Sequence, residues 1–371
     1  MRCYRFFLNT SLLLPCLLVA TLSTPVPSNA SSNASSNESH LKALYINYWA
    51  ASSKKYKNNL FKLIDATSIN AVVIDIKNEF GELAYISDIN LAHDIGAHRK
   101  AFIKDHTLFL EPFKKRKLYT IARLSIFKDN LLAKQRPEWA VKDSENELWN
   151  DSQGLAWTDP FVDEVQEYNL QIAMDVMNMG FDEVHFDYIR FPGVNGLHFI
   201  EKNTLRNRVD AISIFLERNR AQMQASTVKV SVATYGYSCW NNNDTYIGHQ
   251  VKELAGIVDY LSPMLYPSSF QLGIPGYRNP VNNPYEIVLY TLKRCAKSSG
   301  YPPEKFRPWL QAFKDYGFDR RVFGVHEIKQ QIKAAVDSQA SGWMLWNPAS
   351  HYPIREVFET DQKTQSRITS P

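Results

Sequence analysis

The feature that most constrains this chain is the regular recurrence of short apolar segments rich in Val, Ile, Tyr and Trp. Eight segments have the composition of buried β-strands, at residues 41–49, 69–77, 117–127, 181–189, 228–237, 257–266, 306–313 and 342–347. Apolar residues at three- and four-residue intervals predict helices over 159–180, 204–224 and 325–339. Strand and helix alternating eight times predict a closed parallel barrel, the (β/α)8 TIM barrel of the α/β class, as a single domain.

An open, doubly wound sheet is the alternative to the barrel. Such a sheet usually carries a Gly-rich turn after its first strand. The residues after the first segment, NYWAASSKK, contain no G-x-G-x-x-G pattern. The barrel is therefore the predicted fold, and its first well-marked helix is expected to use Asp159 as N-cap, Pro160 in its first turn and Gly180 as its stop.

The two ends of the chain differ from this block in composition. Residues 1–30 combine Arg2 and Arg5, an interrupted apolar stretch and a small-residue cleavage site ending at Ala30, which predicts a signal peptide. Residues 31–40 form a Ser/Asn-rich linker, and 360–371 form a polar, flexible tail. We expect a barrel domain over 41–359 in an exported protein, periplasmic or secreted, without stable membrane insertion after cleavage.

Charge and cysteine content narrow the classes of partner. The formal charge of +4 falls to about +2 when Arg2 and Arg5 leave with the signal peptide, so nothing argues for a nucleic-acid partner. Cys239 and Cys295 remain in the mature chain. The sequence leaves open whether they pair in an exported protein or stay as two small buried hydrophobic residues.

Several chemistries have no support in the sequence. There is no H-E-x-x-H, no C-x-x-C, no Walker-type loop and no G-x-S-x-G, and His93, His98 and His106 form only a loose cluster among nine histidines. No metal and no cofactor is predicted.

Charged side chains stand at the ends of the second and third segments. A TIM barrel builds its site at the C-terminal ends of its strands. Asp75 and Lys77 share one phase of the second segment and are either a structural ion pair or a substrate clamp. Glu79 and Glu82 follow in the loop. Arg123 points inward near the end of the third segment, where it is predicted to bind substrate or, alternatively, to neutralise Asp75 or Asp187.

The fourth segment, EVHFDYI, places polar residues at every second position. Glu183, His185 and Asp187 share one face, and Val184, Phe186 and Tyr188 are expected to face the outer helices. Asp187 lies at the strand end and is the first choice for a catalytic carboxylate; the alternative is a structural acid paired with Arg190 or Arg123. We expect His185 and Arg190 to bind substrate.

The later segments end in aromatic and amide side chains. These are Met264 and Tyr266, Trp309 and Gln311, and Trp346 and Asn347. Rings stack on the apolar faces of sugars while amides and acids bind their hydroxyls, so these six residues are predicted to bind substrate. The alternative is that the aromatic rings only fill the top of the barrel.

Carboxylates and aromatic rings in a barrel mouth favour glycoside hydrolysis, which needs two carboxyl groups at the scissile bond. We expect Asp187 as nucleophile or base, with Glu79, Glu82 or Asp75 as the second acid. The predicted ligand is a polysaccharide or oligosaccharide.

Six ordered motifs carry a family resemblance. The segments AVVIDIKNEFGELAY, IARLSIFKD, FDEVHFDYIRFP, VDYLSPMLYPSSF, RPWLQAF and GWMLWNP resemble the bacterial "putative glycosyl hydrolase domain", a family of unknown function near the alpha-amylase-like barrels. The resemblance covers nearly all of 41–350 and implies a TIM barrel with glycosidase activity. It also implies that Asp187 stands where amylase-like barrels keep the nucleophile of their fourth strand.

Two positions depart from the family pattern. Ala233 and Ala312 stand where the resemblance implies acids at the ends of strands five and seven. Two hypotheses therefore compete: an exported glycosidase, and a catalytically impaired barrel that binds glycan without cleaving it. A barrel with other chemistry based on Lys77 and Asp75 stays open because fold does not fix function.

Overall fold

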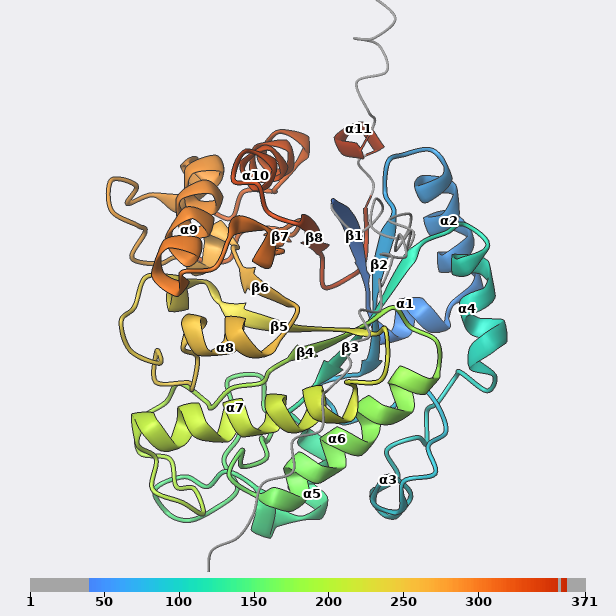
Figure 1. Cartoon of the computed structure of the whole chain (residues 1–371), viewed down its shortest axis with the longest axis vertical. Coiled ribbons are helices and arrows are strands. Elements are labelled where there is room, and N and C mark those ends of the chain that lie inside the picture. Colours follow the sequence, from blue (N-terminus) through green and yellow to red (C-terminus); the bar gives the residue numbers. More distant parts are fainter. Residues whose placement is uncertain (1–39, 353–354, 359–371) are drawn as a thin grey trace, which may run out of the picture. The chain divides into compact units, whose positions relative to one another are not determined.

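The computed structural model describes residues 40–352 and 355–358, and in them the eight strands close into one parallel barrel in sequence order, with β8 paired to β1. Figure 1 shows this barrel with the longer helices outside it. The predicted TIM barrel is confirmed, and each predicted segment contains one strand. The strands are β1 (Leu41–Ile46), β2 (Ala71–Lys77), β3 (Tyr119–Ser125), β4 (Glu183–Asp187), β5 (Lys229–Tyr235), β6 (Tyr260–Met264), β7 (Trp309–Gln311) and β8 (Gly342–Trp346).

The helices lie in the gaps between these strands and after β8. They are α1 (Tyr48–Ser52), α2 (Lys54–Asp65), α3 (Asn90–Ile95), α4 (His106–Lys114), α5 (Asn130–Gln135), α6 (Asp163–Asn178), α7 (Leu205–Gln222), α8 (Val251–Ile257), α9 (Pro284–Ser299), α10 (Val325–Asp337) and α11 (Arg355–Phe358). In the described part of the chain, no helix is long and apolar enough to cross a membrane.

One predicted helix start is wrong. Helix α6 begins at Asp163 with Val162 as its N-cap, and the carboxylate of Asp159 instead accepts hydrogen bonds from the backbone N–H groups of Phe161 and Ile200. Asp159 therefore ties two loops together, because its side chain satisfies buried backbone donors before the helix starts.

Successive side chains of β4 point to opposite faces of the strand, and the two faces of the barrel sheet border two separate apolar cores. Val184 and Phe186 are fully buried between the barrel and its helices, where the Phe186 ring meets Phe215 of α7 at 5.5 Å. The opposite faces of the strands fill the barrel interior with residues such as Tyr45 and Trp309. This two-sided burial is typical of parallel barrel strands.

Strand register brings the predicted polar residues side by side. Arg123 on β3 stands opposite Asp75 on β2 and opposite His185 on β4, and Ser125 stands opposite Asp187. Because parallel strands align their carboxyl ends, this register gathers the charged groups at one end of the barrel.

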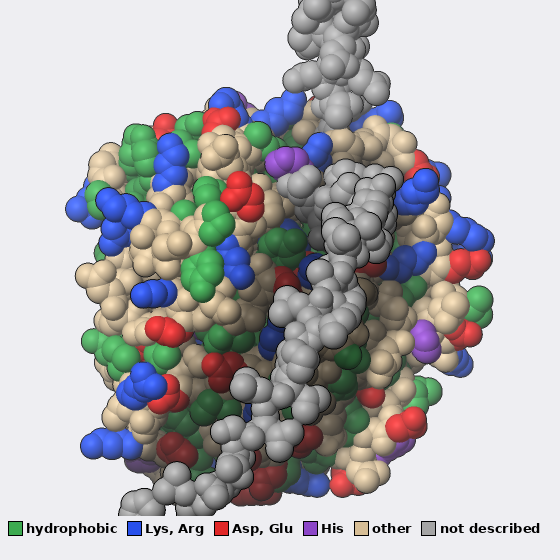
Figure 2. All heavy atoms as spheres, in the orientation of Figure 1, with side chains coloured by type: hydrophobic (Ala, Val, Ile, Leu, Met, Phe, Trp, Pro, Cys, Tyr) green, Lys and Arg blue, Asp and Glu red, His purple; other side chains and the backbone are tan. Residues whose placement is uncertain are grey.

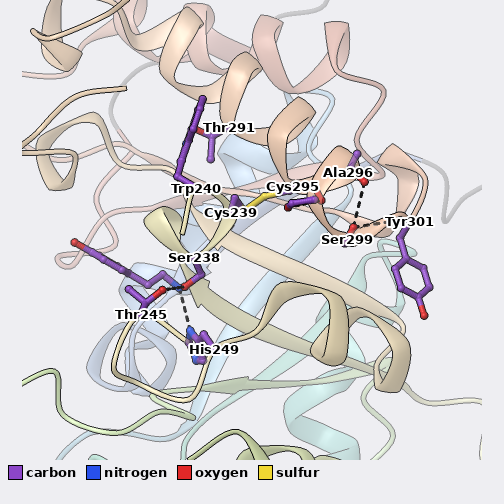
Figure 3. The surroundings of a disulfide bond; sticks show 12 residues. Ser238, Cys239, Trp240, Thr245, His249, Thr291, Cys295, Ala296, Ser299 and Tyr301 are labelled. Atoms are coloured by element: carbon purple, nitrogen blue, oxygen red, sulfur yellow. Dashed lines mark hydrogen bonds between the residues drawn. A yellow bond between two sulfur atoms is a disulfide. The ribbon is translucent and has the colours of Figure 1, made fainter. Parts of the chain in front are cut away.

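A disulfide joins Cys239, at the end of a short 3-10 turn after β5, to Cys295 of α9 (Figure 3). Their Cα atoms are 4.7 Å apart. The indole N–H of Trp240 also donates to the Thr291 hydroxyl at 3.0 Å, so two contacts fasten the same turn to α9. Of the two alternatives left open by the sequence, the structure shows the pair.

On the face shown in Figure 2, Lys and Arg side chains are interspersed with Asp and Glu. Surface ion pairs such as Arg116 with Asp65 and Arg220 with Asp259 join opposite charges. The predicted signal peptide (1–30), the linker up to residue 39 and the tail (360–371) lie outside the described residues, so these boundaries stay predictions.

Candidate active site

A cavity of about 460 Å³ opens at the carboxyl ends of the barrel strands. It is lined by side chains from β3 to β8 and from the loops that follow them. The lining residues are Arg123, Asp187, Tyr188, Arg190, Gly193, Tyr235, Thr245, Ile247, Met264, Tyr266, Ser269, Tyr316 and Trp346. Asp187 is the one carboxylate in this lining.

Arg123 is the centre of a buried cluster of carboxylates at the cavity floor. Its Nη1 donates to Asp75 at 2.6 Å, its Nη2 to Glu79 at 2.6 Å, and its Nε to Oδ2 of Asp187 at 2.8 Å. A planar guanidinium offers five N–H donors in a fixed fork, which suits several carboxylates at once. Glu79 and Asp187 both lie against Nη2, at 2.6 and 2.8 Å, so these two carboxyl groups are close neighbours.

Both oxygens of Asp187 are held in place. Oδ2 faces Arg123, and Oδ1 accepts the backbone N–H of Tyr188 at 2.7 Å. Burial opposes ionisation of this carboxyl, but Arg123, His185 and the Tyr188 N–H outweigh it and lower the pKa of Asp187. Asp187 is therefore a fixed anion at neutral pH, facing the cavity.

Asp75 lies below Arg123 and outside the cavity lining. The hydroxyl of Tyr45 on β1 donates to its Oδ2 at 2.5 Å, and Arg123 bonds to its other oxygen. Burial raises the pKa of Asp75 to about 6, with Glu79 adding to the effect and Arg123 and Tyr45 opposing it. This buried acid positions Arg123.

The loop after β2 sends Glu79 and Glu82 in different directions. Asn78 accepts the backbone N–H groups of Phe80 and Glu82, which shapes a tight turn. Gly81 in this turn has φ +84°, and a Cβ there would lie 2.1 Å from a carboxylate oxygen of Asp129. Glu79 reaches Arg123 with its side chain 20% exposed, whereas Glu82 pairs with Lys100 at 2.5 Å. The structure thus brings Glu79 and not Glu82 to the cluster.

Lys77 does not reach the cavity. A register shift between Asp75 and Lys77 changes the phase of β2, so these two residues do not share a face as expected. The Lys77 ammonium is fully buried, 2.7 Å from Asp129 and 2.8 Å from Oδ1 of Asn169 on α6. It is the structural ion pair, with a different partner from the one predicted.

His185 and Trp309 form the layer beneath the cavity. His185 is fully buried, with Nε2 accepting from the Trp309 indole at 3.1 Å and Nδ1 beside Ser231 Oγ at 2.7 Å. Burial lowers the pKa of His185 to about 4. Because the hydroxyl of Ser231 in turn donates to Glu183, the network assigns the proton to Nδ1 of a neutral ring. Neither side chain lines the cavity, so the predicted substrate contacts are wrong for both.

The amide side chains of Gln311 and Asn347, which were predicted to bind substrate, are hydrogen-bonded within the protein instead. Gln311 is fully buried, bonded to Ser268 on the loop after β6, and Asn347 donates to the Ala312 carbonyl at 2.6 Å. Their hydrogen-bonding groups are used within the protein, and neither lines the cavity.

The aromatic wall of the cavity combines predicted and unpredicted rings. Trp346 stacks on Tyr45 at 3.9 Å between ring centroids, with the Arg123 guanidinium 4.9 Å from its ring. Met264 and Tyr266 complete this side, Tyr235 comes from the end of β5, and Tyr316 comes from the loop after β7. Trp346, Met264 and Tyr266 thus lie in the cavity as expected from strand phase, and Arg190 reaches it from the loop after β4.

The sequence missed Tyr188, Tyr235, Tyr316, Thr245, Ile247 and Ser269. Tyr188 was expected to face the outer helices, but β4 ends at Asp187 and Tyr188 adopts φ +49°, which turns its ring into the cavity. Tyr235 shares the inward phase of Ser231 on β5, so strand alternation could have found it. The others lie on loops, where no period applies.

The two alanines lie in different places. Ala233 is in the barrel interior, one pleat below Tyr235, whereas Ala312 packs in the core between barrel and helices. A side chain at 312 therefore does not face the cavity. No cluster of three or more potential metal ligands occurs among residues 40–352 and 355–358.

A parallel eight-stranded barrel with a carboxylate cluster and an aromatic cavity at its strand ends has the architecture that TIM-barrel glycosidases use. The chain belongs to the family described as "Putative glycosyl hydrolase domain", whose sequence profile matches residues 43–352. No curated protein matches the chain.

Several solved structures with the same fold are glycoside hydrolases. The PgaB (BpsB) glycoside hydrolase domain from Bordetella bronchiseptica aligns with 12% identity over 87% of this chain and 100% of its own, with a TM-score of 0.62. The catalytic domain of beta-amylase from Paenibacillus polymyxa aligns with 10% identity over 88% and 96%, with a TM-score of 0.54. A class V chitinase from Pseudomonas fluorescens Pf-5 aligns with 11% identity over 86% and 98%, with a TM-score of 0.53. At these identities the similarity shows the fold.

Proposed function

We propose that the protein is an exported glycoside hydrolase that cleaves O-glycosidic bonds of an oligosaccharide or polysaccharide, with Asp187 as its central carboxylate. The observation that carries this proposal is the position of Asp187, ionised and fixed by Arg123 in a cavity walled by aromatic rings. An ionised carboxylate at this point can attack the anomeric carbon or activate water.

Glu79 is the second carboxyl in this mechanism. It shares the Arg123 guanidinium with Asp187 and is the more exposed of the two, with 20% of its side chain accessible against 11%, although it does not itself line the cavity. Asp75, with 3% of its side chain accessible, positions Arg123 instead. Glu79 then supplies the proton that the leaving oxygen needs.

A binding barrel without catalysis is the second candidate function. Ala233 leaves the fifth strand without an acid, and both oxygens of Asp187 are already bonded within the protein. The aromatic wall around Trp346 serves binding in either case.

The disulfide supports export. Cys239 and Cys295 pair in the structure, and disulfides persist mainly in oxidising compartments. This fits the predicted signal peptide and a periplasmic or secreted location.

The test is a panel of polysaccharides incubated with purified protein and assayed for new reducing ends. The hydrolase predicts release from at least one glycan. Binding of several glycans without any release, with binding lost in Trp346→Ala, would instead support the binding barrel.

A further inference from the structure

Arg190 lies in the wall between two cavities. It follows the end of β4 by three residues and lines both the main cavity and a neighbouring one of about 370 Å³, here called the side pocket. The lining of the side pocket includes Lys128, Trp149, Asp151 and Trp157 from the segment between β3 and α6. Tyr188 and Gly193 also line both cavities, so they adjoin.

The side pocket is bordered by the partly exposed rings of Trp149 and Tyr188, with the buried Trp157 packed against both. Trp157 meets Trp149 at 6.3 Å and Tyr188 at 5.6 Å between ring centroids. Indole and phenol rings bind the apolar faces of sugars. A glycan that enters the main cavity can therefore continue into the side pocket.

Lys128 and Asp151 cancel one another's charge in the side pocket. Their charged groups are 2.7 Å apart, and the Trp157 indole donates to the same carboxylate oxygen at 3.0 Å. The other oxygen of Asp151 accepts the backbone N–H groups of Gln153 and Leu155. Both oxygens of Asp151 thus already accept two hydrogen bonds each within the protein.

Arg190 makes no direct ion pair with a carboxylate in the described part of the chain, although the charges of Asp187 and Asp151 are near enough to act on it. No Asp or Glu oxygen within the described residues lies within 4.0 Å of its guanidinium. Its hydrogen bond within the protein is from Nη1 to the Phe191 carbonyl at 3.2 Å. The guanidinium packs over Trp157 at 4.7 Å and Tyr188 at 5.6 Å, which fixes its plane. Of its five N–H donors, most stay free for a ligand in the cavities that it lines.

We propose that Arg190 binds an oxyanion of the substrate, so that the glycan cleaved at Asp187 is anionic and carries a carboxylate or sulfate on the sugar in the side pocket. This rests on the proposed function. A guanidinium recognises planar and tetrahedral oxyanions through paired, charge-assisted hydrogen bonds. The charged sugar belongs in the side pocket because the Asp187 carboxylate repels an anion in the main cavity, where Arg123 is already paired with Asp75, Glu79 and Asp187.

The test compares binding of three oligosaccharides of equal length by calorimetry at low and moderate salt. These are an oligogalacturonate, a sulfated neutral-sugar oligomer and an uncharged cello-oligosaccharide. The proteins are the wild type, Arg190→Gln, Arg190→Lys and the control Arg206→Gln, an exposed residue of α7 paired with Asp210. The two charged ligands separate carboxylate from sulfate as the source of the anion.

The proposal predicts that the wild type and the control prefer a charged ligand over the neutral one, with a preference that weakens as salt rises. Arg190→Gln should weaken charged-ligand binding roughly 10- to 100-fold and leave neutral-ligand binding unchanged. Arg190→Lys should lie between them, because an ammonium keeps the charge and loses the fork.

Equal binding of charged and neutral ligands by the wild type would overturn the proposal while leaving the hydrolase intact. Equal weakening of both ligand types by Arg190→Gln would also overturn it and assign Arg190 a packing role. If Arg190→Gln does not fold, two other measurements test the proposal. The wild type should lose its preference for charged ligands as salt rises, and Arg190→Lys should bind charged ligands more weakly than the wild type. The absence of both effects would overturn the proposal. Failure of every oligosaccharide to bind or be cleaved would remove the proposed function itself.

Discussion

Nε of Arg123 donates to Oδ2 of Asp187 at 2.8 Å, and this bond ties the third strand of the barrel to the fourth at the floor of the cavity. The same guanidinium holds two further carboxyl groups, so one buried cation balances three acids. Such a centre depends on its cation, because uncompensated buried charge is costly.

Removing that cation should destabilise the fold. Arg123→Met leaves Asp75, Glu79 and Asp187 without their shared partner, and we expect a loss of about 3 to 5 kcal/mol in the free energy of unfolding at pH 7.5. The loss should be smaller at pH 4, because protonation of carboxyl groups in this cluster reduces the repulsion between them. Urea unfolding at the two pH values measures both, and an equal loss at each pH would contradict the electrostatic explanation.

Asp75 should make stability depend on pH in a defined window. Because burial raises its pKa to about 6, the folded protein binds more protons than the unfolded chain between about pH 4 and 6. This group's contribution to the free energy of unfolding therefore falls as pH rises through that window, by up to about 3 kcal/mol. Asp75→Asn should lack this fall, which urea midpoints from pH 4 to 8 would show. Parallel curves for the two proteins would refute the assignment.

Glu79 and Glu82 form a matched pair for testing the second carboxyl. Glu79→Gln should lower the rate of reducing-end release about 10²- to 10⁴-fold, the usual effect of losing a general acid. Glu82→Gln should stay within about twofold of the wild type, because this side chain pairs with Lys100 and not with Arg123. Equal rates for both variants would remove Glu79 from the mechanism.

The disulfide should contribute measurably to stability. It closes a loop with a sequence separation of 56, for which chain entropy gives about 4 kcal/mol. The double variant Cys239→Ser with Cys295→Ser should lose roughly this amount and become insensitive to reductant. If reductant leaves the midpoint of the wild type unchanged, the bond is absent from the folded protein in solution.

Strand periodicity was enough to predict the barrel and much of the cluster. Asp75, Arg123 and Asp187 lie on inward faces near strand ends, where alternation places them without knowledge of loops. Lys77 was misplaced because a shift of register in β2 changes the face of every residue after it.

Loop geometry and hydrogen-bond competition could not be predicted in the same way. Glu79 and Glu82 follow the same strand, and the turn built by Asn78 decides which one reaches Arg123. Gln311 carries an amide that could bind a sugar hydroxyl, yet this amide is hydrogen-bonded to Ser268 in the loop after β6. Tyr188 reaches the cavity through a left-handed backbone that strand alternation does not show.

The most direct test of the account is the rate of reducing-end release by Asp187→Asn on a glycan that the wild type cleaves. We expect a loss of about 1,000-fold or more, because the amide can neither attack nor activate water. The melting temperature should stay within a few degrees, since Asn keeps the size and an acceptor for Arg123. Asp210→Asn, in an exposed pair on α7, serves as control. A folded Asp187→Asn protein that retains a tenth or more of the wild-type rate would contradict the central role of Asp187.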